Sequence, residues 1–219
     1  DGSSNFAEGN RWGVFPSVAA GWRFLEEDFM APLKSVLSNG KLRLSYGETG
    51  NSNVGDVAYS YYKLGERNNI FGGSMINGVY LDQLGNNALT WETSREWNVG
   101  LDLGFLDGRI NVTAEYYHKN ISDLLNERKL LSYNEVNKII ANVGKTQSQG
   151  FELTINTTNI RNKDFEWTSD LTFSLYRDKW KERDPNWKPS AYSEYNGYIR
   201  SYAGYLSDGL VQPGETIDH

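Results

Sequence analysis

The chain has 219 residues and no cysteine, which removes disulfide frameworks, thiol nucleophiles and cysteine-ligated metal sites together. Its net charge of -6, without a clustered stripe of Lys and Arg, argues against a nucleic-acid partner. The mean hydropathy is -0.61 and no run of about 18 apolar residues occurs, so we expect no transmembrane helix. A soluble all-β domain and a barrel with strands apolar on one face both remain open.

The first predicted strand covers residues 17–24, where apolar and polar side chains alternate directly after Pro16. Residues 26–37 then place apolar side chains at helical spacing behind an acidic start, which predicts a short amphipathic helix. The Ser-Asn-Gly sequence at 38–40 ends it, and a second strand follows over residues 41–46.

Two pairs of strands with clear alternation come next. Residues 93–105 and 109–117 are joined only by Leu106-Asp107-Gly108, and we expect the two strands to be antiparallel neighbours. Residues 151–157 and 165–176 are joined by a short polar segment at 159–164.

Long irregular loops are predicted between these strands, at residues 47–92 and 118–148, and another loop follows residue 177. A last strand is expected within 198–211. Short turns at one end of the strands and long loops at the other are typical of outer-membrane β-barrels, with the turns in the periplasm.

Alternation alone does not separate a barrel from a soluble sandwich, because both have one apolar and one polar face. The strict succession of short and long connections favours the barrel, and so do aromatic side chains expected at strand ends. These aromatic residues are Trp22, Trp97, Tyr116, Tyr117, Trp167 and Tyr176.

Five short motifs occur in the order in which SusC/RagA-type TonB-dependent transporters carry them. The first two are NRWGVFPSVAAGWR at 10–23, and FM at 29–30 followed by LRLSYGETGN at 42–51. The others are LTWE at 89–92 with NVGLD at 98–102, YYHK at 116–119 with DLL at 123–125, and GY at 204–205 with SDGL at 207–210. Together they cover nearly the whole chain, which therefore resembles this family.

The resemblance implies an all-β fold: a partial antiparallel up-and-down transmembrane β-barrel, a section of a roughly 22-stranded barrel with long extracellular loops. Residues 1–219 would all belong to the receptor barrel domain, with the plug domain and the barrel ends outside this chain. The implied function is active import of an oligosaccharide or peptide across the outer membrane of a Gram-negative bacterium of the Bacteroidota.

The implied partners are a SusD-like surface lipoprotein, the TonB-ExbB-ExbD complex acting through a missing N-terminal region, and outer-membrane lipid. Nucleic acid is not expected. The alternative from another class is a soluble all-β carbohydrate-binding module.

Charged side chains on the polar faces of the strands are predicted to form a lumen-facing wall that links neighbouring strands. This predicted wall consists of Arg23, Lys41, Arg43, Glu96, Asp102, Glu115, Glu152, Glu166 and Asp170. Its carboxylates are of the type that glycosidases pair, but a solvated wall explains them better. His118 and His219 have no spacing that suggests a triad, so we expect no catalytic residue and no enzyme.

Exposed aromatic residues outside the strands are the predicted ligand or lid contacts, because sugar rings and peptides stack well on them. They are Tyr59, Tyr61, Tyr62, Trp187, Tyr192 and Tyr195, with Trp180 in the same class. The alternative is packing of these loops on themselves. No zinc, EF-hand or phosphate-loop motif occurs and no cofactor is expected, although calcium ligation by Asp82, Asp178 or Asp184 in loops stays open.

Overall fold

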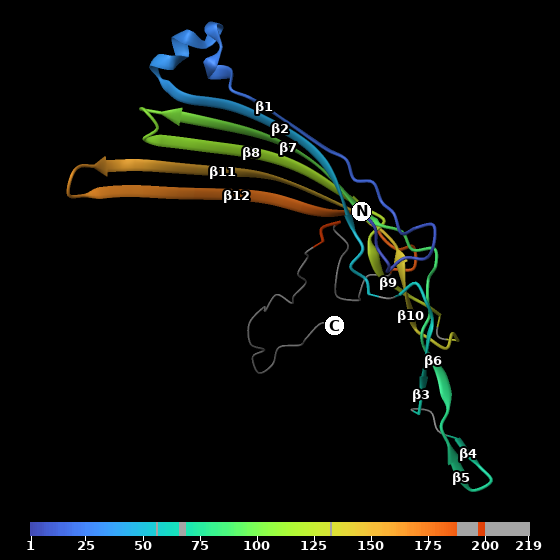
Figure 1. Cartoon of the computed structure of the whole chain (residues 1–219). Coiled ribbons are helices and arrows are strands. Elements are labelled where there is room, and N and C mark those ends of the chain that lie inside the picture. The colour runs from blue at the N-terminus through green and yellow to red at the C-terminus, as the bar shows by residue number, and fades with distance from the viewer. Residues whose placement is uncertain (56, 66–68, 132, 188–196, 200–219) are drawn as a thin grey trace, which may run out of the picture.

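A computed structural model describes residues 1–55, 57–65, 69–131, 133–187 and 197–199. Its main element is a six-stranded antiparallel sheet with the order β1-β2-β7-β8-β11-β12 (Figure 1). These strands are β1 (Ser17–Trp22), β2 (Leu37–Asn51), β7 (Glu92–Phe105), β8 (Ile110–Ser122), β11 (Lys145–Arg161) and β12 (Glu166–Glu182). The first six predicted strands and both predicted hairpins are therefore present, in sequence order across the sheet. The last strand, expected within 198–211, lies almost wholly outside the described residues.

All strands of this sheet except β1 are longer than the alternation predicts. β11 begins at Lys145 instead of residue 151, and β12 continues to Glu182 instead of residue 176. Antiparallel pairing uses main-chain groups, so it continues where the side chains become polar on both faces. Four of the aromatic residues expected at strand ends consequently lie inside their strands: Trp97 in β7, Tyr116 and Tyr117 in β8, and Tyr176 in β12.

The two predicted long loops contain three small hairpins. One hairpin pairs β3 (Tyr61–Leu64) with β6 (Val79–Gln83), and a second pairs β4 (Asn69–Phe71) with β5 (Ser74–Ile76). The third pairs β9 (Leu125–Lys129) with β10 (Lys138–Asn142). All three lie at the end of the sheet opposite the short turns, and the β3–β6 and β4–β5 hairpins form an arm that projects away from it (Figure 1).

The predicted helix at 26–37 is a pair of 3-10 segments, η1 (Phe24–Glu26) and η2 (Asp28–Ser35). Pro32 lies inside η2 and has no main-chain N–H, which disfavours a continuous α-helix there. The first strand ends at Trp22 rather than residue 24, because Arg23 leaves the extended conformation with φ -84° and ψ 73°. Among the described residues, no helix is both long and apolar enough to cross a membrane.

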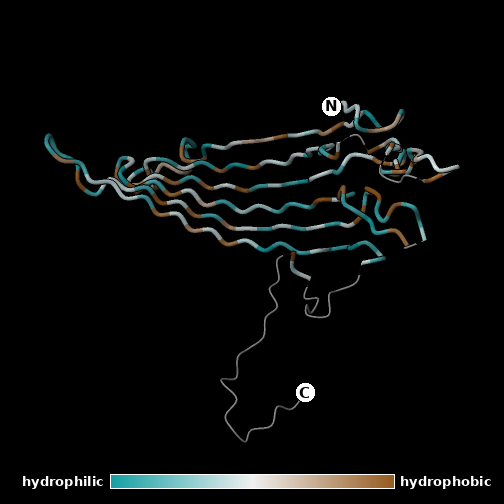
Figure 2. Tube along the Cα trace, turned by 90° about the horizontal axis from the view of Figure 1, so that it is seen from below, coloured by the Kyte–Doolittle hydropathy of each residue, from teal (hydrophilic) through white to brown (hydrophobic). Residues whose placement is uncertain are grey.

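The register gives the sheet one continuous apolar face. A row of directly paired residues crosses all six strands: Trp22, Leu42, Leu101, Ala114, Leu153 and Phe173. Figure 2 shows the resulting alternation of apolar and polar residues along each strand. In β7 the apolar positions run from Trp97 to Phe105, close to the 9–11 residues that a tilted membrane-spanning strand needs.

This apolar face is not covered by a second layer in the described residues. Phe173 is 53% exposed and Leu171 is 61% exposed, whereas Leu101 and Leu153 are partly exposed. The buried apolar residues lie outside the six-stranded sheet: Phe6, Leu25, Ala58, Leu89, Val136, Ala141 and Val143. A soluble sandwich would enclose the apolar face against another sheet, and the described residues contain only the small hairpins besides this sheet.

Candidate functional site

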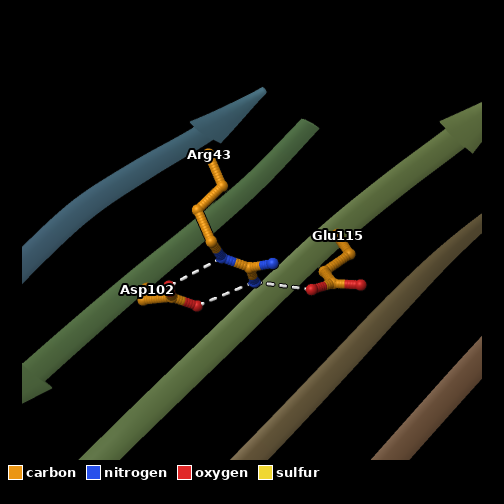
Figure 3. Close-up of polar contacts among 3 residues, drawn as sticks. All are labelled: Arg43, Asp102 and Glu115. Atoms are coloured by element: carbon orange, nitrogen blue, oxygen red, sulfur yellow. Dashed lines mark hydrogen bonds and ion pairs between the residues drawn. The ribbon is translucent and has the colours of Figure 1, made fainter. Parts of the chain in front are cut away.

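The polar face of the sheet carries an ion-paired cluster formed by three strands (Figure 3). Arg43 of β2 donates from Nε to Oδ2 of Asp102 at 2.8 Å and from Nη2 to Oδ1 at 3.0 Å. The same Nη2 also donates to Oε1 of Glu115 on β8, at 2.5 Å. The guanidinium therefore holds a carboxylate from each of two neighbouring strands in the bidentate and bridging geometry that suits arginine.

Arg43 reaches β8 because the residue between them has no side chain. The register places Gly100 of β7 directly opposite both Arg43 and Glu115. A Cβ at Gly100 would lie 2.8 Å from Cζ of Arg43. Glycine at this position leaves the guanidinium room to cross the middle strand.

The rest of the predicted wall lies on the same polar face, with one exception. Lys41 is directly opposite Asp102, and Lys119 pairs with Glu96 at 3.9 Å. Further along the sheet Asp170 accepts from Asn156 Nδ2 at 2.6 Å, and Glu166 pairs with Arg161 at 3.4 Å. The exception is Arg23, which lies beyond β1 and pairs with Glu26 at 4.0 Å.

Carboxylates outnumber cations around the cluster. Glu152 of β11 is directly opposite Glu115, and it forms no ion pair within the described residues. Like charges directly opposite on neighbouring strands are unfavourable. Arg43 reduces this repulsion by neutralising part of the charge of Glu115.

At the long-loop end, the N-terminal segment packs into an aromatic cluster of Phe6, Phe15 and Trp91. The ring of Trp91 lies 5.4 Å from Phe6 and 5.3 Å from Phe15, both edge to face. Phe6 is fully buried. Phe15 fills the space above Gly50 of β2, where a Cβ would lie 2.0 Å from its ring. These contacts tie the N-terminal segment to both ends of the connection between β2 and β7.

A cavity of about 370 Å³ lies next to the end of β12, between it and the β9–β10 hairpin. Its lining includes Trp180, Arg183 and Trp187, and the guanidinium carbon of Arg183 lies 4.8 Å from the Trp180 ring and 3.8 Å from the Trp187 ring. A cation stacked between two indoles is held by both ring faces. The cavity thus combines flat aromatic surfaces with charged groups.

The position of this segment is stabilised by an ion pair from Arg128 to Asp184 at 2.8 Å. Burial alone would raise the pKa of Asp184, but the N–H of Asn186 and the guanidinium of Arg128 outweigh it. The pKa of Asp184 is therefore held below its usual value.

The two long loops contact each other around a larger cavity of about 720 Å³, which lies between β6 and β10. The N–H of Leu81 donates to Oε1 of Glu135 at 3.2 Å, and Asn86 Nδ2 donates to the carbonyl of Ile140 at 2.9 Å. These bonds connect residues far apart in the sequence. The loops consequently form one packed layer at this end of the sheet.

The predicted aromatic contacts do not lie together. Trp187 lines the smaller cavity, whereas Tyr59, Tyr61 and Tyr62 line neither cavity. Tyr61 and Tyr62 belong to β3, and Trp180 belongs to β12, so the expectation that these three lie outside strands is wrong. Tyr192 and Tyr195 lie outside the described residues.

The sequence reasoning missed Arg183, although its spacing between two tryptophans is a usable signal. Of the candidate calcium ligands, Asp82 lies in β6 and Asp178 in β12, so the expectation that they lie in loops is wrong for both. Asp82 pairs with Lys63 at 3.2 Å. The described part of the chain contains no group of three or more His, Asp or Glu side chains arranged to hold a metal.

Comparisons with known proteins agree with this architecture. The model of the family described as "TonB dependent receptor-like, beta-barrel" matches residues 1–211. TonB-dependent receptor SusC of Bacteroides thetaiotaomicron is 39% identical over 180 residues, covering 80% of this chain and 18% of that protein. TonB-dependent receptor P3 of Formosa agariphila is 36% identical over 182 residues, covering 82% of this chain and 18% of that protein.

Among solved structures, a chain of the RagAB peptide transporter superposes with a TM-score of 0.73 at 26% identity. The match covers 83% of this chain and 19% of that chain. The chain thus spans less than a fifth of the length of these relatives.

Proposed function

The chain belongs to the TonB-dependent receptor β-barrel family, in its SusC/RagA-type branch, and on that premise we propose that it forms part of the wall of an outer-membrane nutrient importer. The observation that carries this proposal is the two-faced sheet. Its apolar face is continuous and, apart from Phe24 and Leu25 over Gly40 at the short-turn end, uncovered in the described residues, and its opposite face carries the ion-paired wall. A sheet with these two faces suits the wall of a membrane barrel, because one face contacts hydrocarbon and the other contacts a water-filled interior.

The proposed orientation follows from the two ends of the sheet. The short turns and the η1–η2 segment face the periplasm, and the hairpins and both cavities face the exterior. The polar wall then borders the lumen, where Arg43 and its partners contact water or the plug. The protein would be located in the outer membrane of a Gram-negative bacterium of the Bacteroidota.

Transport would be energised by TonB-ExbB-ExbD acting through a plug and an N-terminal region outside residues 1–219. In this proposal, residues 1–219 contribute no catalytic residue. Calcium could bind in the outer loops at Asp184, the candidate ligand that lies outside the strands.

A SusD-like lipoprotein would close over the outer loops. The β3–β6 and β4–β5 arm supports this, because large side chains along it are exposed: Tyr62 by 68%, Leu64 by 73%, Ile70 by 74% and Met75 by 70%. Exposed apolar and aromatic side chains on a projecting arm are typical of a surface that binds another protein.

The substrate would be an oligosaccharide or a peptide. The cavity with Trp187 and Arg183 supports either class, because sugar faces and peptide groups both stack on indole and guanidinium planes. The structural similarity to a peptide transporter supports the peptide class.

The test measures uptake of labelled oligosaccharides and oligopeptides by cells that lack the full-length protein and are complemented with it or with variants. We expect uptake of one class to require the protein and to stop when a protonophore removes the proton gradient. Trp187→Ala should reduce this uptake, whereas Phe165→Ala, at the opposite end of the sheet, should not. Uptake that persists without the protein, or that ignores the protonophore, would refute the proposal.

A further inference from the structure

The connection between β1 and β2 differs from the other connections at the short-turn end. β7 and β8 are joined by residues 106–109, and β11 and β12 by residues 162–165; each turn is mostly polar and exposes one large apolar side chain, Leu106 by 62% and Phe165 by 56%. The β1–β2 connection is much longer and contains η1 and η2. It also exposes large apolar side chains: Phe29 by 66%, Leu33 by 43% and Val36 by 61%.

This segment folds back onto the apolar side of the sheet. Gly40 of β2 belongs to the apolar face, in register with Leu103 of β7. A Cβ at Gly40 would lie 2.7 Å from the ring of Phe24 and 3.1 Å from Cβ of Leu25. The start of the segment therefore occupies the space over the apolar face, and Leu25 is buried there.

Trp22 extends this contact along the segment. Its side chain belongs to the apolar face, and its ring lies 6.0 Å from Phe24 and 6.4 Å from Phe29. Its indole N–H donates to Oε1 of Glu27 at 3.0 Å. The aromatic surface that begins on β1 thus continues without a break onto η2.

The polar groups of the segment suit a boundary between hydrocarbon and water. Glu26, Glu27 and Asp28 are exposed at its start, and Lys34 is exposed near its end. Aromatic side chains with one polar end and short amphipathic segments prefer the headgroup level of a bilayer.

We infer that η1 and η2 form an interfacial anchor, in which Phe29, Leu33 and Val36 insert into the membrane leaflet at the short-turn end. The inference rests on the proposed function, since it needs the apolar face of the sheet to contact lipid. Continuity with that face identifies lipid as the occupant: a protein bound at the same place would have to displace the lipid that surrounds the sheet.

The test uses nitroxide labels on single cysteines, which this cysteine-free chain allows; any native cysteine elsewhere in the full-length protein is replaced by serine. Phe29→Cys and Val36→Cys report on the anchor. Phe173→Cys reports on the apolar face of the sheet, and Lys163→Cys reports on a polar turn at the same end. The protein is placed in phosphatidylcholine nanodiscs, and collision of each label with oxygen and with a water-soluble nickel chelate is compared.

We expect the oxygen-to-nickel ratio at residues 29 and 36 to exceed that at residue 163 and to approach that at residue 173. A water-like ratio at both anchor positions, with a lipid-like ratio at 173, would overturn the anchor and leave the proposed function standing. A water-like ratio at 173 would overturn both. If either anchor variant does not fold, the other alone decides the outcome.

Discussion

Replacing Arg43 by methionine is expected to weaken the sheet locally, because it removes the cation shared by Asp102 and Glu115. Methionine retains most of the length and apolar surface of the arginine stem, so the main loss is the charge and its hydrogen bonds. Two carboxylates would then lie close together with Lys41, directly opposite Asp102, as the neighbouring cation, and Glu152 lies directly opposite Glu115. Uncompensated like charges at this spacing are unfavourable.

The size of the effect follows from the exposure of the three side chains, which is 34% for Arg43, 22% for Asp102 and 27% for Glu115. Removing one partner of a fully buried pair costs about 3–5 kcal/mol, and an exposed pair contributes about 1 kcal/mol or less. The partly exposed cluster lies between these limits, so we expect about 2 kcal/mol. Since about 1.4 kcal/mol is a factor of ten, local opening of β2 from β7 should become roughly 30 times more frequent.

The assay is amide hydrogen exchange of the full-length protein in lipid, followed in peptides that cover β2 and β7. A matched control is Arg95→Met, because Arg95 pairs with Glu48 at 3.1 Å but is 50% exposed, and its loss should change exchange by less than about fivefold. Neutralising both carboxylates as well, with Asp102→Asn and Glu115→Gln, should restore more than half of the lost protection. Unchanged exchange in Arg43→Met, or no recovery in the triple variant, would refute the reasoning.

Two further predictions concern the outer loops. In Gly85→Ala the new Cβ would lie 2.3 Å from the main-chain carbonyl carbon of Tyr59, so the loop must open. Limited proteolysis near β3 should therefore be faster than in the native protein, while hydrogen exchange of the β8 peptides should stay unchanged; equal cleavage rates in the variant and the native protein would contradict this. The N–H of Asn186 and the guanidinium of Arg128 together lower the pKa of Asp184 against the effect of burial, so the stabilisation is complete above the ordinary aspartate pKa of about 4 and is lost as pH falls through the lower folded-state pKa. Asp184→Asn should therefore speed exchange in residues 183–187 at pH 6, and the difference from the native protein should shrink as the pH falls below about 4; a difference independent of pH would contradict the assignment.

The two faces of the sheet were predictable because alternation with period two directly reports the direction of side chains along a strand. Leu42, Leu101 and Phe173 were assigned to one face from sequence and are joined in one row by the register. The strand ends were not predictable, since residues such as Gln147 and Lys119 are polar like loop residues but continue the ladder. Pairing there depends on the neighbouring strand.

The details of the candidate site depend on register and on loop packing, which a single sequence does not specify. Arg43 was predicted on the polar wall, but its reach to Glu115 needs Gly100 to lie between them. Trp187 was a predicted contact, yet the stacking of Arg183 against it depends on how the chain turns after β12. The family motifs carry no information on either contact.

In a barrel wall, successive residues of one strand face lipid and water in turn, and β8 offers a stretch where this can be measured directly. Single cysteines at consecutive positions of residues 111–116, in the full-length protein in nanodiscs, are exposed to a water-soluble maleimide. The account predicts rapid labelling at 111, 113 and 115 and slow labelling at 112, 114 and 116, because the latter belong to the apolar face. Uniform labelling, or rapid labelling at the apolar positions instead, would contradict it.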